Sequence, residues 1–227
     1  WDPETRYALG HENLRRFLQD DSAWGERLRK LSNHLAVIAT NLFAPDWNRF
    51  DVEDPVDQYF VFHVLAHAGT GGMELPNMKV LINNLRTSCR SLVNRRRFSE
   101  ALAGYSACYE MCQLLPEDER QSKSQQRKRL ADILKDRGRT LALLGRLDEA
   151  EESQTESLEL YRGLPNVKSN RHLKYTVADL LGNLGLTLDG LARFDEAIEM
   201  HSDCLEVLQE MTKQHGSTTD LERKLAA

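Results

Sequence analysis

The stretch LGNLGLTLDGLARFDEAIEMHSDCLEVL, residues 181–208, decides how the rest of the chain is interpreted. Two segments, each long enough for a helix, flank a short turn around Arg193. In both segments apolar residues recur at three- and four-residue spacing, which is the pattern of an amphipathic helix. The stretch therefore predicts a helical hairpin.

The same pattern occurs twice earlier in the chain. RRRFSEALAGYSACYEMCQLLP begins at residue 95, LGRLDEAEESQTESLELYRGLP begins at residue 144, and an apolar-periodic segment precedes each. Two sets of aligned positions lie 49 and then 47 residues apart: Ala101, Ala150 and Ala197, and Cys89, Gly138 and Gly185. Repetition at a fixed period predicts hairpins that bury their apolar faces by stacking on their neighbours.

Each repeat consists of a first helix, a short turn and a second helix. The turns fall around Arg97, Arg146 and Arg193. The second helices are expected to open on Ser99, Asp148 and Asp195, because Ser and Asp are preferred N-cap residues. The glutamate that follows each of them favours the positive end of a helix.

These residues carry a family resemblance. The stretch 181–208, with the pair Leu184 and Gly185 and the turn before FDEA, resembles a tetratricopeptide repeat of the longer type found in kinesin light chains. The resemblance implies an all-α solenoid of antiparallel hairpins. The first repeat departs from the pattern, because Cys89 stands where glycine is usual. A standard repeat has about 34 residues, so we expect longer helices or a longer loop here.

The repeats define the expected domain organisation. The array spans residues 73–227, with units at about 77–116, 123–165 and 170–214 and a partial fourth unit from 218. Residues 1–72 do not repeat and are expected to form a separate helical segment. The run GTGG at residues 69–72 is expected to be the turn between the two modules.

The first segment resembles another family. Tyr7, His11, Leu14, Phe17 and Leu18 are similar to the segment that closes the winged-helix part of NACHT- and NB-ARC-type signalling ATPases. A later helix matches a Tyr-His-His-Ala-Gly pattern of those proteins through Tyr59, His63, His67, Ala68 and Gly69. The resemblance covers residues 5–69 and implies a multidomain nucleotide-switch protein whose ATPase core is one candidate partner of the array.

The sequence holds no nucleotide-binding motif of its own. A phosphate-binding loop needs Gly-x4-Gly-Lys-Ser/Thr, and GTGGME has no such lysine. Because the chain opens on Trp1 rather than methionine and its last helix is cut short, we expect it to be a piece of a longer polypeptide.

The resemblance to tetratricopeptide repeats also implies a binding surface. In such arrays the first helices line a concave groove that holds a peptide or a partner helix. The outward positions that carry over are Asn83, Arg86, Arg90 and Asn94, then Asp132, Lys135, Arg139 and Leu143, then Asp179, Gly182, Leu186 and Gly190. The cations of the first two repeats could bind an acidic segment, tempered by Asp132 and Asp136. Ordinary solvated charges are the alternative.

Composition argues against several other partners. A net charge of −5 lacks the concentrated basic face that nucleic acid requires. No apolar run reaches the roughly 18–20 residues of a membrane span. Four cysteines are too few for a disulfide scaffold, so we expect a reducing, cytoplasmic location.

Two clusters raise the question of catalysis. Cys108 and Cys112 lie one helical turn apart, as a metal or redox pair would. Their counterparts in the other repeats are not thiols at both positions, so packing is the preferred interpretation. His63 and His67 have the spacing of a helical zinc site, but the glutamate of a zincin is replaced by Val64. We expect no enzyme activity and no cofactor.

Three functions remain as hypotheses. The first is an interaction module of a signalling ATPase that binds a protein or peptide. The second is a free-standing scaffold or adaptor. The third, a metal-dependent enzyme, depends on His63 and His67.

Overall fold

The computed structural model describes residues 75–115 and 124–215, together with a few isolated positions between residues 26 and 35. Within the two continuous ranges every regular element is an α-helix. The helices are α4 (Leu75–Asn94), α5 (Phe98–Leu114), α7 (Ser124–Leu143), α8 (Leu147–Arg162), α9 (Arg171–Gly190) and α10 (Phe194–His215). The predicted all-α solenoid of helical hairpins is confirmed.

The chain divides into two compact units, Trp1–Ser88 and Cys89–Ala227, and the division falls within α4. The sequence places a module boundary earlier, at residue 72. In the first unit the described part of α4 buries Leu81, Ile82 and Leu85 completely. The second unit holds the end of α4 and the five helices that follow.

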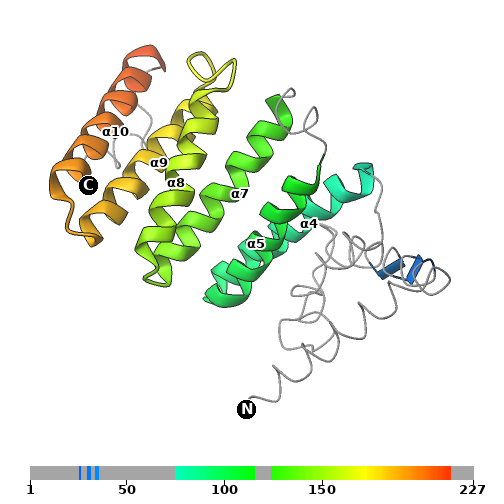
Figure 1. The fold of residues 1–227 in the computed structure, drawn as a ribbon. Coiled ribbons are helices and arrows are strands. Elements are labelled where there is room, and N and C mark those ends of the chain that lie inside the picture. The colour runs from blue at the N-terminus through cyan, green and yellow to red at the C-terminus, as the bar shows by residue number, and fades with distance from the viewer. Residues whose placement is uncertain (1–25, 27–29, 32–33, 36–74, 116–123, 216–227) are drawn as a thin grey trace. The chain divides into compact units, whose positions relative to one another are not determined.

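The five helices after α4 lie side by side in chain order in the second unit (Figure 1). Each helix packs against the next, from α5 and α7 through to α9 and α10. The helices α7 and α8 have 20 and 16 residues, which together already exceed the roughly 34 residues of a standard repeat. Longer helices therefore account for much of the long spacing between repeats.

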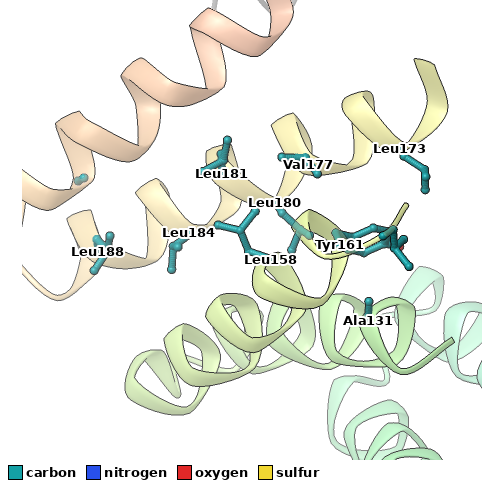
Figure 2. Close-up of a cluster of buried hydrophobic side chains, with 11 residues drawn as sticks. Ala131, Leu158, Tyr161, Leu173, Val177, Leu180, Leu181, Leu184 and Leu188 are labelled. Carbon is teal, nitrogen blue, oxygen red and sulfur yellow. The ribbon is translucent and has the colours of Figure 1, made fainter. Parts of the chain in front are cut away.

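The largest hydrophobic cluster lies where the second and third repeats meet. It brings Tyr161 and Leu158 of α8 against the apolar side of α9, with Ala131 of α7 at its edge (Figure 2). Leu180 and Leu181 of α9 are each 1% exposed. Burial on this scale is the main stabilising term of a stacked array.

The three turns between paired helices share one backbone geometry. In each turn one residue has a positive φ: Arg96 at 61°, Gly145 at 74° and Ala192 at 60°. The N–H of the next residue donates to a carbonyl five residues back, as in the 3.0 Å bond from Arg146 to Leu141. This is the Schellman motif that ends helices, and it confirms turns at the predicted positions.

Substitutions at Gly145 and Ala192 are expected to shift stability in opposite directions. A side chain in the left-handed region is strained, so Gly145→Ala should lower the free energy of unfolding by about 1 kcal/mol and Ala192→Gly should raise it by about as much. A Cβ added at Gly145 would meet nothing within 4 Å, so the backbone conformation alone is tested. Urea denaturation measures both changes. Two shifts of the same sign would contradict this interpretation of the turns.

The predicted N-caps are wrong by two residues. The helices α5 and α8 have Arg97 and Arg146 at the N-cap, and neither side chain caps the backbone. Ser99 and Asp148 lie inside the first turn, where an acidic side chain still complements the helix dipole.

The arginine of each turn instead binds the glutamate three residues later. Arg146 donates from Nε and Nη2 to the two carboxylate oxygens of Glu149, each at 2.6 Å, and Arg193 holds Glu196 in the same way. Arg97 donates to Glu100 at 2.9 Å. These hydrogen bonds lower the pKa of each of the three glutamates.

Candidate functional site

The predicted binding positions on α7 form one side of that helix. Arg139 is exposed, Leu143 is 50% exposed, and Asp132 and Lys135 are partly buried. Positions three and four residues apart lie on one side of a helix, while the opposite side of α7 buries Ile133, Leu134 and Leu141.

The helix α9 contributes the neighbouring part of the surface. Leu186, which occupies the repeat position of Arg139, is 65% exposed, and Gly190 is exposed. Asp179 and Gly182 are partly buried. The helices α7 and α9 contact each other. Their outward positions are called here the first-helix face: Asp132, Lys135, Arg139, Leu143, Asp179, Gly182, Leu186 and Gly190.

The predicted positions on α4 fall into both units. Asn83 is exposed and Arg86 partly buried in the first unit, where the carbonyl of Asn83 accepts from Thr87 at 3.0 Å. Arg90 and Asn94 are exposed and belong to the second unit.

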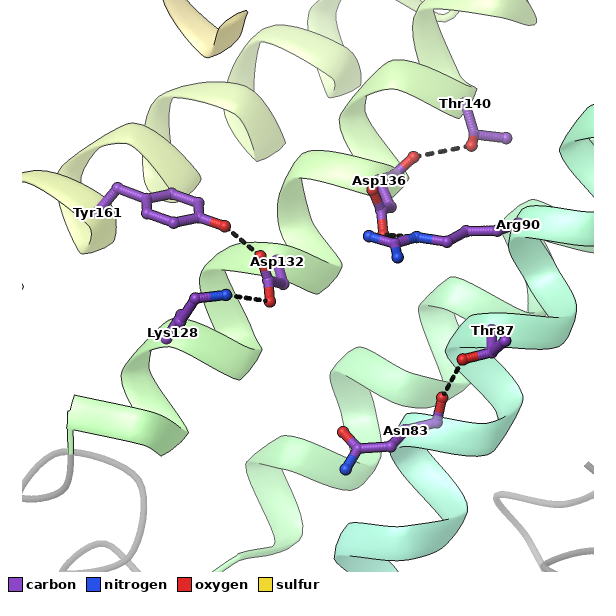
Figure 3. Close-up of polar contacts among 8 residues, drawn as sticks. All are labelled: Asn83, Thr87, Arg90, Lys128, Asp132, Asp136, Thr140 and Tyr161. Atoms are coloured by element: carbon purple, nitrogen blue, oxygen red, sulfur yellow. Dashed lines mark hydrogen bonds and ion pairs between the residues drawn. The ribbon is translucent and has the colours of Figure 1, made fainter. Parts of the chain in front are cut away.

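Acidic residues already engage part of the predicted basic patch. Arg90 donates from Nε to Asp136 at 3.1 Å, which joins the end of α4 to α7 (Figure 3). Asp132 accepts from Lys128 at 3.0 Å and from the hydroxyl of Tyr161. By contrast, Lys135 and Arg139 form no ion pair with any described residue. Of these two cations, Arg139 is exposed and Lys135 is partly buried.

The cysteine pair is explained by packing. Cys108 and Cys112 are buried free thiols, and burial raises the pKa of Cys112 to about 11. Burial likewise raises the pKa of Cys89 far above its usual value. A thiol that stays protonated is a poor nucleophile and metal ligand.

The counterparts of Cys108 identify what this position does. Ser157 donates its hydroxyl to the carbonyl of Ala131 at 2.7 Å, and Cys204 donates its thiol to the carbonyl of Ala178 at 3.1 Å. In both repeats a small side chain of the second helix contacts the backbone of the first helix. This agrees with the predicted close-approach position.

A cleft that no sequence motif indicates lies between α5 and α7. It has a volume of about 440 Å³ and is called here the seam cleft. Its lining residues are Ser99, Leu102, Ala103 and Ser106 of α5, Arg137 and Leu141 of α7, and Leu144 and Arg146 of the following turn. The sequence does differ between the repeats at this place. Leu102 occupies the repeat position that Glu151 occupies in the next repeat.

Several predicted features fall outside the described residues. They include the first segment with His63 and His67, the GTGG run and the partial fourth repeat. Within the described part of the chain no group of three or more potential metal ligands occurs. None of the helices described is long and apolar enough to cross a membrane.

Comparison with known proteins bears on the repeats. Residues 129–210 match the family model described as a tetratricopeptide repeat. The match covers α7 to α10 with the exception of their outermost residues. No curated protein matches the chain. The family match and the stacked hairpins together support a tetratricopeptide array, a fold that generally serves as a non-enzymatic scaffold for protein interactions.

Proposed function

We propose that this chain is a protein-interaction module that binds a partner segment on the first-helix face. The observation that carries the proposal is the presence of two exposed leucines, Leu143 and Leu186, beside Lys135 and Arg139. Neither cation forms an ion pair with a described residue. Exposed apolar side chains beside charged ones are typical of a surface that becomes buried when a partner binds.

The chemistry of this face favours an acidic, amphipathic partner. Arg139 presents a planar guanidinium suited to a carboxylate, and Leu143 lies one helical turn further along α7. Leu186 extends the apolar surface onto α9. A helix or extended segment that carries both acidic and apolar side chains would complement these groups.

Partner capture with matched variants tests the proposal. The chain would be used to capture partners from cell extract, in parallel with Arg139→Glu, Leu186→Glu and the control Lys168→Glu. Lys168 is an exposed lysine between α8 and α9, outside the first-helix face. Proteins that bind this face should be lost with the first two variants, by about tenfold or more for a buried charge reversal, and retained with the control.

The same set of captured proteins from all four chains would contradict the proposal. Circular dichroism of each variant shows whether the helices are intact, so loss of folding is distinguished from loss of binding.

We also propose that the array belongs to a cytoplasmic signal-transducing ATPase and controls it. Support comes from the resemblance of residues 5–69 to NACHT- and NB-ARC-type proteins. A partner that prefers one state of such a protein shifts it toward that state by the difference in affinity. A Walker-type phosphate loop encoded upstream in the same polypeptide would support this assignment, and its absence would leave the free-standing scaffold.

A further inference from the structure

The boundary between the second and third repeats contains an arginine that holds two carboxylates. Arg193 uses Nε and Nη2 for Glu196 of its own repeat. Its remaining terminal nitrogen, Nη1, donates to Glu151 of the preceding repeat at 2.7 Å. Together the two carboxylates raise the pKa of Arg193, the contact with Glu196 being the larger cause.

The boundary between the first and second repeats has the same arginine but lacks the second carboxylate. Arg146 corresponds to Arg193 and holds Glu149 through Nε and Nη2. The counterpart of Glu151 is Leu102, which is 8% exposed. The nitrogen Nη1 of Arg146 therefore has no hydrogen-bond partner among the described residues, and the seam cleft opens beside it.

A second arginine lines the seam cleft. Arg137 occupies the position of Leu184, a buried core residue of the third repeat. It donates from Nη1 to Ser153 at 2.7 Å and lies over the ring of Tyr109, 5.8 Å from the ring centre. Its Nε atom is buried and has no hydrogen-bond partner among the described residues. A buried donor left unpaired costs about 1–3 kcal/mol, so an acceptor at this place would be stabilising.

The remaining lining residues suggest the shape of the ligand. Ser99 and Ser106 bring hydroxyl groups, whereas Leu102 and Leu141 bring apolar surface. The volume of about 440 Å³ lies in the range of small-ligand sites. Two arginines beside an apolar wall fit an anion that carries a short hydrocarbon chain.

We propose that the seam cleft binds a carboxylate on an aliphatic stem, held by Arg146 and Arg137. The ligand carboxylate takes the place that Glu151 fills at the next boundary, and its stem packs on Leu102 and Leu141. A glutamate side chain of a partner and a free short-chain acid share this chemistry. The site is separate from the first-helix face, so the inference does not rest on the proposed function.

Titration with hexanoate tests the proposal. The probe is added to the full ¹⁵N-labelled chain, and the Nε–H signals of the arginine side chains are followed at constant ionic strength. Hexanamide, which has the same stem without charge, and inorganic phosphate, which has charge without a stem, are the comparison probes. We expect saturable shifts of the Arg137 and Arg146 signals with hexanoate, and binding about tenfold weaker for each of the other two.

Four variants locate the site. Arg146→Gln should weaken hexanoate binding about tenfold, while Arg193→Gln, the matched change at the next boundary, should leave it unaltered. Leu102→Glu introduces at this boundary the carboxylate that Glu151 supplies at the next one. The new carboxylate would occupy the place of the ligand carboxylate and should abolish binding. Because Leu102 is buried, Ala103→Glu, at a partly exposed lining position, provides a second blocking variant if Leu102→Glu fails to fold.

Two results would overturn the proposal. One is equal binding of hexanoate, hexanamide and phosphate, which would mean that the cleft does not recognise a carboxylate on a stem. The other is hexanoate binding that stays unchanged both in Arg146→Gln and, measured separately, in a blocking variant that folds. A glutamate-bearing peptide, blocked at both ends, then distinguishes the two sources: binding like that of hexanoate indicates a partner side chain, and failure to bind indicates a free acid.

Discussion

Replacing Tyr161 with alanine is expected to lower the free energy of unfolding of the array by about 3–5 kcal/mol. The side chain is 1% exposed and lies in the cluster between α8 and α9 (Figure 2). Removing a buried ring loses its transfer free energy and leaves a cavity that the surrounding helices fill only in part. Its neighbours include Leu164 and Leu173, which close the cluster at the loop end.

Tyr161→Phe is the matched control, because it keeps the ring and removes only the hydroxyl that donates to Asp132. One hydrogen bond to a charged group is worth about 1.5–3 kcal/mol, and Asp132 retains Lys128 as a partner at 3.0 Å. Urea denaturation of both variants gives the comparison. If the alanine variant were no less stable than the phenylalanine variant, the ring would not be part of the core.

Gly138→Ala is expected to destabilise the array, although alanine is the better helix former. A Cβ at this position would lie 2.8 Å from Cγ of Gln154 and 3.2 Å from the carbonyl oxygen of Ala150. Overpacking of this kind costs about 1–3 kcal/mol, and the helix preference of alanine offsets only about 1 kcal/mol. We expect a net loss of up to about 2 kcal/mol in thermal or urea unfolding.

Gly182→Ala is the control for this change. A Cβ at Gly182 would meet only the sulfur of Cys204, at 3.8 Å, which is an ordinary contact. The same substitution should therefore stabilise the array by about 1 kcal/mol. The interpretation of Gly138 as a close-approach position would fail if both variants gained stability.

The sequence alone predicted the features that repeat. The spacing of the alanines predicted three hairpins, and the counterparts of Cys108 predicted a small side chain at the place where Ser157 and Cys204 contact the first helices. These features can be predicted from the sequence because the two helices of each repeat pack against each other in the same way.

The sequence did not reveal contacts that depend on local geometry. Ser and Asp are both preferred N-cap residues, and Asp is also favourable within the first turn. The residue types alone therefore did not fix the positions of Ser99 and Asp148 relative to the helix start. The pair between Arg90 and Asp136 joins residues 46 positions apart and depends on how neighbouring repeats stack. The seam cleft lies where the repeats differ, with Leu102 at the position of Glu151. Aligning the repeats by their shared residues does not reveal such a difference.

The contact between Glu151 and Arg193 also has a consequence for the order of the hairpins. A shortened chain that lacked the second hairpin would place Leu102 opposite Arg193 and would lose the ion pair. The hairpins are therefore not interchangeable building blocks. The ion pair between Glu151 and Arg193 forms only when the second hairpin directly precedes the third.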